Sequence, residues 1–227
     1  MALSGLAILL LLSALSWLYA RHLKKTSRQL ERMVLERTRE LEASREQLRI
    51  QATHDGLTGM LNRTAILRTL GAEMERAARE SRTVVVALVD LDHFKRVNDG
   101  FGHMAGDEAL RWFSAAVGTA IRSYDHAGRY GGEEFLLVLT EVPHESVVQR
   151  LTILHGAISN LQIQTHEFDF SIACSMGATV FDPSAGPGSV ESLLAIADDA
   201  LYAAKAQGRN RVILQLAGAD LKPGHAA

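Results

Sequence analysis

The sequence lacks several features that would define other classes of protein. It contains a single cysteine, Cys174, among 227 residues, which excludes an internal disulfide and fits a reducing compartment. It contains no internal repeat and no low-complexity tract. Residues 1–20 carry no charged side chain, and residues 21–52 contain neither glycine nor proline. These differences in composition separate two N-terminal segments from the rest of the chain. The rest is long enough for one domain with its own core.

Charge is also unevenly distributed. Residues 21–50 carry nine Lys or Arg and five Glu, a net charge of +4, whereas the whole chain carries −2, so that residues 51–227 carry −6. Passive binding of nucleic acid requires clustered basic charge. The C-terminal domain is therefore not expected to bind a nucleic acid polymer, although it can hold a nucleoside triphosphate where metal ions bridge the two negative partners.

The first segment contains an apolar run, residues 3–20, of about the length that a helix needs to cross a bilayer. Trp17 and Tyr19 lie near its end, where amphipathic rings favour the membrane interface, and three cations follow directly. Positive charge on this flank predicts that residues 1–20 form a single transmembrane helix with the next domain in the cytoplasm. A cleaved signal peptide is the alternative, which is less favoured because no Lys or Arg precedes the run.

The second segment, residues 21–52, is rich in Glu, Arg, Leu and Gln and is predicted to form one helix. Val34, Leu41 and Leu48 recur every seven residues, while a second apolar series, offset by three or four positions, breaks after two leucines. This pattern indicates a weak coiled-coil seam that would bring two copies of the next domain together. A solvated, charged linker helix is the interpretation that remains open beside it.

The third segment, residues 53–216, alternates predicted strands with predicted helices, which indicates an α/β or α+β fold with a central sheet. A turn cluster at residues 54–59 ends the long helix. The continuous apolar run of residues 84–91 suits a strand buried on both faces. Further strands are predicted at residues 134–140, 168–181 and 212–216. Helices are predicted at residues 63–81, 105–123, 146–161 and 190–207, and residues 217–227 are expected to be a disordered tail.

Acidic residues stand at the ends of two of these strands. Asp90 lies at the end of the first apolar run, where a buried carboxylate is costly unless it is paired and where ligands commonly bind. Gly131 and Gly132 allow positive φ and a tight hairpin turn before Glu133 and Glu134. Together the three acids can hold hard divalent cations, and two such ions can serve the attacking and leaving oxygens of a phosphoryl transfer. Taken alone, the Gly-Gly-Glu-Glu sequence is equally typical of a solvated hairpin.

Five ordered motifs together resemble the GGDEF domain, the diguanylate cyclase family. The name-giving signature stands here as Gly-Gly-Glu-Glu-Phe at residues 131–135, with Glu at its third position. The resemblance covers residues 54–213 and includes Asp-Leu-Asp-His-Phe-Lys-Arg-Val-Asn-Asp at residues 90–99. The other motifs are His-Asp-Gly-Leu-Thr-Gly-Met-Leu-Asn-Arg at 54–63, Gly-His and Gly-Asp-Glu-Ala-Leu at 102–103 and 106–110, and Ala-Asp-Asp-Ala-Leu-Tyr with Lys-Ala-Gln-Gly-Arg-Asn at 197–202 and 205–210.

The resemblance implies a bacterial diguanylate cyclase, a nucleotidyltransferase that condenses two GTP into cyclic di-GMP and two pyrophosphates. It implies the nucleotide cyclase and polymerase palm fold, with a mostly antiparallel central sheet flanked by helices. Each domain would hold one GTP, and the 3′-hydroxyl of one would attack the α-phosphate of the other across a homodimer. With the apolar run, it implies a single-pass protein of the bacterial inner membrane. The implied cofactor is Mg²⁺ or Mn²⁺, two ions per active site.

The resemblance also implies roles for residues. The metal ions would be bound by Asp90, the backbone carbonyl of Leu91, Glu133 and Glu134, and one of the two glutamates would help to deprotonate the attacking hydroxyl. Lys95 is implied to be a catalytic residue, as the two glutamates are. It would neutralise the negative charge of the triphosphate together with two C-terminal cations, Lys205 and Arg209. A cation at Lys205 would equally suit the last turn of a helix, where it opposes the helix dipole.

The nucleotide base would be bound by Asn98 and Asp107, and His103 is implied to contact the substrate. An Asp carboxylate can accept two hydrogen bonds from the N1–H and N2–H₂ edge of guanine, which adenine lacks, so Asp107 favours GTP. Turn capping beside glycine is the alternative role for Asn98 and Asp107. Packing or solvation is the alternative for His103.

Arg122 and Asp125 form an Arg-x-x-Asp sequence five residues before Gly131. In the family a motif at this offset is a product-inhibition site, so cyclic di-GMP is implied as an inhibitor. Arg can grip a phosphate or a guanine edge with two hydrogen bonds, and Asp can accept from guanine donors. Three other readings remain: an inactive GGDEF domain that binds cyclic di-GMP or GTP as a signalling module, a membrane-tethered scaffold, and a cyclase with another nucleotide preference.

Overall fold

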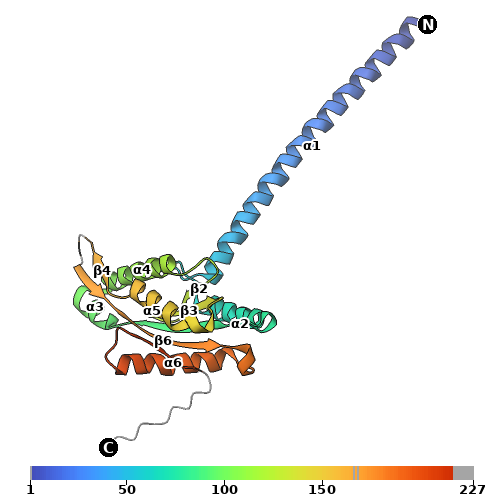
Figure 1. Cartoon of the computed structure of the whole chain (residues 1–227). Helices are drawn as coiled ribbons and strands as arrows, with labels where there is room; N and C mark the ends of the chain where they lie inside the picture. The colour runs from blue at the N-terminus through green and yellow to red at the C-terminus, as the bar shows by residue number, and fades with distance from the viewer. Residues whose placement is uncertain (1, 166, 168, 217–227) are drawn as a thin grey trace, which may run out of the picture. The chain divides into compact units, whose positions relative to one another are not determined.

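The structure, a computed structural model, describes residues 2–165, 167 and 169–216, without the side chains of residues 2–11, 14, 20 and 26–32. The chain divides into two compact units at the boundary between residues 52 and 53. The first unit is a single helix, α1 (Ala2–Thr53), and the second is the α/β domain (Figure 1). The predicted C-terminal tail, residues 217–227, lies outside the described residues.

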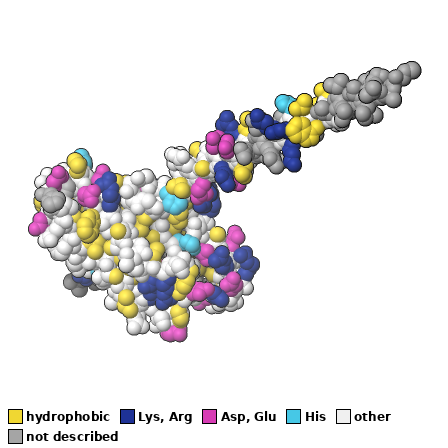
Figure 2. Space-filling view, turned by 90° about the horizontal axis from the view of Figure 1, so that it is seen from above, with side chains coloured by type: hydrophobic (Ala, Val, Ile, Leu, Met, Phe, Trp, Pro, Cys, Tyr) yellow, Lys and Arg dark blue, Asp and Glu magenta, His cyan; other side chains and the backbone are white. Residues whose placement is uncertain are grey.

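Helix α1 continues without a break through residues 21–52, where no glycine or proline interrupts it. Figure 2 shows basic and acidic side chains interspersed along its described part. Val34, Leu41 and Leu48, the predicted seam, are exposed by 57%, 58% and 61%. Within the described part of the chain, no helix has an apolar stretch long enough to cross a bilayer. Much of the predicted membrane segment, residues 3–20, has side chains outside that part.

The domain is built on one five-stranded sheet with the strand order β2-β3-β1-β6-β7. All neighbours pair antiparallel except β6 and β7, which pair parallel. The predicted fold class, a mostly antiparallel sheet flanked by helices, is therefore confirmed. The strands are β2 (His126–Arg129), β3 (Glu134–Thr140), β1 (Val84–Leu91), β6 (Cys174–Phe181) and β7 (Val212–Leu214), and a separate hairpin contains β4 (Leu161–Gln164) and β5 (Asp169–Ile172).

Helices cover both faces of this sheet (Figure 1). Strand β1 is buried along its whole length, with Val85, Ala87 and Val89 in one apolar cluster and the alternate residues in the other. Burial of each valine or leucine side chain contributes about 1.5–3 kcal/mol, which favours an apolar sequence along a strand that is buried on both faces. One face is covered by α2 (Arg63–Glu80) and α6 (Val190–Ala206), and the other by α3 (Phe94–Phe101), α4 (His103–Ala120) and α5 (Val147–Ile158).

Three short elements were not predicted: α3, β2 and β4. The expected helix of residues 146–161 ends at Ile158, because Ser159 is extended and Leu161 begins β4. The expected helix of residues 105–123 begins at His103 and ends at Ala120. Two single 3₁₀ turns, His144–Ser146 and Pro183–Ala185, complete the domain.

Gly177 brings α6 into direct backbone contact with the sheet. A Cβ atom at Gly177 would lie 2.1 Å from the amide nitrogen of Leu201 and 2.2 Å from the carbonyl oxygen of Ala197. Both of these atoms belong to the α6 backbone, so a side chain at position 177 would force the helix away from β6. Since α6 carries Lys205 in its last turn, this close approach also sets the distance between that lysine and β1.

Gly177→Ala is expected to lower the free energy of unfolding by about 3 kcal/mol, at the upper end of the usual cost of overpacking. Urea denaturation of the two proteins measures the difference. The control is Gly118→Ala in α4, where a Cβ meets no atom within 4 Å. This substitution should stabilise the helix by about 0.5–1 kcal/mol. Equal stability of the Gly177→Ala protein and the wild type would contradict the close packing of α6.

Candidate active site at the end of strand β1

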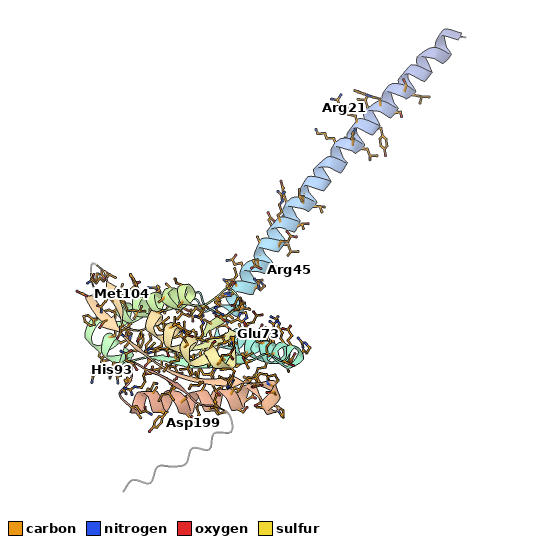
Figure 3. The ribbon with its side chains drawn as sticks, in the orientation of Figure 1. Arg21, Arg45, Glu73, His93, Met104 and Asp199 are labelled. Carbon is orange, nitrogen blue, oxygen red and sulfur yellow. The ribbon has the colours of Figure 1, made fainter. Side chains whose placement is uncertain are left out.

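The candidate site lies where β1 and β3 run side by side beyond the apolar core. Asp90 and Glu134 are direct partners in the antiparallel register, so their side chains project from the same face of the sheet. This face is the one that α2 and α6 cover. Glu133 precedes β3, and its carbonyl oxygen accepts a hydrogen bond of 3.3 Å from the Leu91 amide. His93, labelled in Figure 3, follows β1 and marks this end of the sheet.

Lys205 reaches this site from the last turn of α6, and its Nζ lies 2.8 Å from Asp90 Oδ2. Asp90 is only 7% exposed. Burial raises the pKa of the Asp90 carboxyl above its ordinary value against the opposing effect of Lys205, and the charge of Asp92 raises it further. Burial also raises the pKa of Glu133, and the nearby Asp90 charge adds to this effect. Burial therefore makes the charged forms of Asp90 and Glu133 costly, even with Lys205 present.

The donor set at this site fits a hard divalent cation. Asp90, Glu133 and Glu134 offer only carboxylate oxygens, and a cation would offset the burial and the smaller charge repulsion that raise the pKa values of Asp90 and Glu133. In the described residues, however, no three His, Cys, Asp or Glu side chains are arranged to hold a metal ion by themselves. Mg²⁺ commonly takes one or two carboxylates and completes its shell with water and substrate phosphate oxygens. The residues present thus fit a cation that arrives with a phosphate ligand.

Asp92, for which the sequence suggested no role, holds the walls of the site together. Its carboxylate is buried and accepts hydrogen bonds from Ser175 Oγ at 2.7 Å and from the Asn210 amide at 2.9 Å. Ser175 belongs to β6, and Asn210 follows Arg209 in the loop before β7. The position of Arg209 therefore depends on a carboxylate two residues beyond Asp90. The sequence signal for this role is a second acid at the end of a buried strand, which needs a partner as much as the first does.

The predicted base-binding residues lie on α3 and α4. Gly106 allows these helices to approach closely, because a Cβ at this position would lie 2.1 Å from Asn98 Oδ1. Asn98 is thus placed against the turn of α4 that carries Asp107, which is exposed. Lys95 and His103 are exposed as well. The structure brings Asn98 close to the Asp107 segment, and it brings Asp90 and Lys205 together, but it gives no direct contact between these two sets.

The turn between β2 and β3 differs from the expectation in one respect. Gly131 and Gly132 do not adopt positive φ, so a left-handed turn is not the reason for the two glycines. Gly131 instead leaves room for the end of the Glu134 side chain, because a Cβ there would lie 2.7 Å from Glu134 Oε2, and that carboxylate would have to turn away. The hairpin itself forms as expected and is closed by hydrogen bonds from the amides of Tyr130 and Gly131 to the Glu134 carbonyl oxygen, at 2.8 and 3.1 Å.

The Arg129 side chain holds this turn in place through hydrogen bonds and an ion pair, a role that the sequence did not indicate. Its Nη2 donates to the carbonyl oxygen of Gly132 at 2.7 Å, and its Nη1 lies 3.2 Å from both carboxylate oxygens of Asp55. Asp55 also accepts from the amide and hydroxyl of Thr58, at 2.9 and 2.7 Å. The turn that carries the two glutamates is therefore tied to the loop that follows α1 in the sequence.

The structure separates the two residues of the Arg-x-x-Asp motif. The Arg122 side chain is exposed, and its Nη1 donates to the Tyr124 hydroxyl at 2.9 Å. The Asp125 side chain is only 1% exposed, and its carboxylate accepts hydrogen bonds from the backbone amides of Arg122 and Thr140 and from Arg150. The predicted guanine acceptor is thus occupied by internal partners, while Arg122 faces solvent.

A mostly antiparallel sheet with helices on both faces and carboxylates at the end of its central strand is the architecture of a palm-like nucleotide cyclase domain. The chain belongs to the GGDEF family: the family model "Diguanylate cyclase, GGDEF domain" matches residues 52–211. This match confirms the family resemblance that the five motifs suggested.

Relatives and solved structures agree with this assignment. The chain is 38% identical over 167 residues to diguanylate cyclase DgcP of Pseudomonas aeruginosa, covering 74% of this chain and 24% of DgcP. It is 37% identical over 161 residues to diguanylate cyclase DosC of Escherichia coli, covering 70% and 34% of the two chains. The match to the coiled coil and GGDEF domain of DgcB from Caulobacter crescentus, solved in complex with c-di-GMP, has a TM-score of 0.72 at 32% identity over 82% of this chain and 99% of that one. The chain thus spans only a quarter to a third of these two curated relatives.

Asp55 is expected to make stability depend on acid pH. Burial raises its pKa, but the hydrogen bonds from Thr58 and the charge of Arg129 outweigh burial and hold the pKa of Asp55 below its ordinary value of 3.8. A carboxyl whose pKa is lower in the folded than in the unfolded protein stabilises the fold at any pH above its unfolded-state pKa. This contribution is lost as the pH falls through the folded-state pKa. The Asp55→Asn protein should therefore lose less stability than the wild type between about pH 4 and pH 2.

Urea denaturation at a series of pH values measures this difference. Thr58→Val removes one of the hydrogen bonds to Asp55 and should give a slope between those of the other two proteins. The same slope for Asp55→Asn and the wild type would show that the hydrogen bonds from Thr58 and the ion pair with Arg129 do not lower the pKa of Asp55 in the folded protein.

Proposed function

We propose that the domain is an active diguanylate cyclase that joins two GTP molecules into cyclic di-GMP. The observation that carries this proposal is the placement of Asp90 opposite Glu134 in the sheet, with Glu133 beside them, so that partly buried carboxylates stand where a cation and a phosphate ligand can bind. The names of the relatives DgcP and DosC support the reaction. The intact carboxylates argue against the alternative, an inactive module that only binds a nucleotide.

In the proposed reaction each domain binds one GTP. Asn98 and Asp107 hold the guanine edge, while Lys95, Lys205 and Arg209 offset the charge of the triphosphate. The 3′-hydroxyl of one GTP attacks the α-phosphate of the other, the bond to the bridging oxygen breaks, and pyrophosphate leaves. A second attack in the opposite direction closes the ring. Glu133 suits the role of proton acceptor, because its raised pKa matches a base better than an ordinary carboxylate does.

Magnesium or manganese is the cofactor of the proposed reaction, with two ions per site. The two ions would be held by Asp90, Glu134 and the backbone carbonyl of Leu91, with Glu133 close by. They would stabilise the negative charge on the phosphate oxygens. Lys205, which pairs with Asp90 at 2.8 Å, would then be free to turn to the triphosphate. This exchange of partners gives the lysine one role before the nucleotide binds and another afterwards.

Purified protein with GTP and Mg²⁺ should release pyrophosphate and form cyclic di-GMP, which mass spectrometry identifies. Asp90→Asn and Glu134→Gln should reduce the rate about 100-fold or more, because each removes charge that holds the cation. The control is Asp199→Asn, an exposed carboxylate of α6 (Figure 3) that should keep wild-type activity. Binding of GTP without turnover by the wild type would favour the inactive signalling module, and equal competition by ATP would refute the guanine role of Asp107.

The proposed reaction needs two domains, and we expect α1 to bring them together by pairing with the same helix of a second copy. Val34, Leu41 and Leu48 are each more than half exposed on α1, which suits pairing with a second copy. Pairing would raise the effective concentration of the two half-sites. The apolar run of residues 3–20 and the cations that follow it support a further proposal, a single-pass anchor in the bacterial inner membrane with the domain in the cytoplasm.

A truncation series separates pairing from anchoring. Removal of residues 1–20 should release the protein from the membrane fraction while activity per molecule is kept. Removal of residues 1–52 should in addition lower activity about tenfold or more at nanomolar concentrations, with recovery as the concentration rises. Undiminished activity of the shorter chain at low concentration would rule out a role of α1 in pairing.

The Arg-x-x-Asp turn completes the proposal. Arg122 and Asp125 form a site at which cyclic di-GMP binds and restrains the domains from meeting. The exposed guanidinium of Arg122, which lies 5.7 Å from the ring centroid of Tyr124, supports a contact with a phosphate or a purine.

A further inference from the structure

The loop between α6 and β7 carries Arg209 on a backbone conformation that side chains rarely adopt. Gly208, Arg209 and Asn210 have φ values of 113°, 63° and 46°, three successive positive values. Glycine accepts positive φ, whereas the Cβ of Arg makes it unfavourable, and Asn tolerates it better than most residues. Such a conformation persists only where the surrounding structure imposes it. The contacts around this loop therefore decide where the Arg209 side chain is presented.

The last turn of α6 holds the start of the loop. The Arg209 amide donates to the Ala204 carbonyl oxygen at 3.0 Å, and the Gly208 amide donates to the Lys205 carbonyl oxygen at 3.4 Å. Burial is the main cause of the raised pKa of Asp90, and the charges of Lys205 and, more weakly, Arg209 oppose it. The Arg209 guanidinium therefore lies close enough to the acidic site for its charge to act there.

Asn210 ties the other side of the loop to three segments of the domain. Its backbone amide donates to the buried Asp92 carboxylate at 2.9 Å. Its Oδ1 accepts from Ser159 Oγ at 2.6 Å, and its Nδ2 donates to Asn160 Oδ1 at 3.0 Å. Ser159 is only 6% exposed, and its Oγ also accepts from the Cys174 amide at 3.2 Å. The Asn210 side chain is thus joined to the end of α5 and, through Ser159, to the start of β6.

We propose that Asn210 is a positioning residue, which holds Arg209 where it can offset the charge of the triphosphate, and that Ser159 anchors it. This inference rests on the proposed function and adds to it the support of the phosphate-binding side. Asn210 acts through Arg209 and does not itself touch the nucleotide. Ser159 lies outside every motif of the sequence, so its part in the site comes from the fold alone.

Loss of the Asn210 side chain would release the loop without removing Arg209. The residues with positive φ could then relax, and the guanidinium would spend less of its time at the phosphates. Substrate and transition state share this contact, so its loss raises KM for GTP and changes kcat little. Because Asn210 is exposed, its two side-chain hydrogen bonds should be worth about fivefold in KM.

Steady-state kinetics of Asn210→Gly tests this role. Glycine keeps the backbone amide that donates to Asp92 and accepts the positive φ of residue 210, so only the side-chain contacts are lost. KM for GTP should rise about fivefold, while kcat stays within about twofold of the wild type. Ser159→Ala removes the anchor and leaves the loop residues in place, so it should also raise KM. The control, Ser114→Ala, removes a buried hydroxyl that donates within α4 to the Leu110 carbonyl oxygen, and it should not change KM.

A double-substitution cycle shows whether Asn210 acts through Arg209. Arg209→Met alone should raise KM about tenfold, as expected for the loss of a charge-assisted contact. The protein with both Arg209→Met and Asn210→Gly should then stay within about twofold of Arg209→Met alone. A further rise as large as that of Asn210→Gly by itself would overturn the positioning role, and so would an unchanged KM in Asn210→Gly. A fall in kcat as large as the rise in KM would show that Asn210 supports only the general fold.

Binding of 3′-deoxyGTP separates this inference from the reaction on which it rests. This probe lacks the attacking hydroxyl, so it binds without turnover. In calorimetry with Mg²⁺, Asn210→Gly should bind 3′-deoxyGTP about fivefold more weakly than the wild type, whereas guanosine, which carries no phosphate, should bind both proteins equally.

The outcomes for the two proposals differ. A wild type that binds 3′-deoxyGTP but makes no cyclic di-GMP from GTP would refute the proposed reaction, while weaker binding by Asn210→Gly would still support the hold of Asn210 on Arg209. Equal binding of 3′-deoxyGTP by the two proteins would refute that hold, whether or not the wild type is active. A wild type that does not bind 3′-deoxyGTP would refute both.

Discussion

The burial of carboxylates at the end of β1 is the constraint on which the rest of the domain depends. Asp90 lies near the end of a strand whose apolar residues lie in the core on both faces, and Asp92 follows that strand; both carboxylates are buried. Burying such charges is unfavourable unless partners reach them. The partners come from distant parts of the chain: Lys205 from the end of α6, Ser175 from β6 and the Asn210 amide from the loop before β7. The charge at one strand end thus fixes where the C-terminal third of the domain packs.

The elements that the sequence predicted well are those whose own residues determine their structure. The strand of residues 84–91 and the strand of residues 134–140 were bounded correctly, because each is a continuous apolar run. Strand β2, His-Ala-Gly-Arg, has no such pattern and exists because β3 offers it backbone partners. Helix α3 has only eight residues and includes Asn, Asp and Gly, so its helical form depends on packing against α4. Local propensity cannot reveal structure of that origin.

The candidate site was predictable to a similar extent. The acids at positions 90, 133 and 134 and the cation at 205 were all named from the sequence, and the structure brings Lys205 to Asp90. The sequence did not indicate the ion pairs Arg129–Asp55 and Arg150–Asp125, whose members stand 74 and 25 residues apart. Such pairs depend on which rotamer a long side chain adopts in the folded protein. The wrong expectation of positive φ at the two glycines has the same origin, since the backbone conformation of the turn and the position of the Glu134 side chain beside Gly131 are properties of the folded protein.

Two buried aspartates of this domain show why a motif letter does not determine a role. Asp125 accepts from two backbone amides and one guanidinium, and with 1% of its side chain exposed it is satisfied inside the fold. Asp90 has an ion pair to Lys205, yet burial and the charge of Asp92 keep its pKa raised. Asp125 would have to exchange an internal partner in order to accept from a ligand, whereas Asp90, with a raised pKa, gains from any cation that approaches. The same residue type therefore has a different cost of binding a ligand in the two motifs, and the difference lies in the partners that the fold supplies.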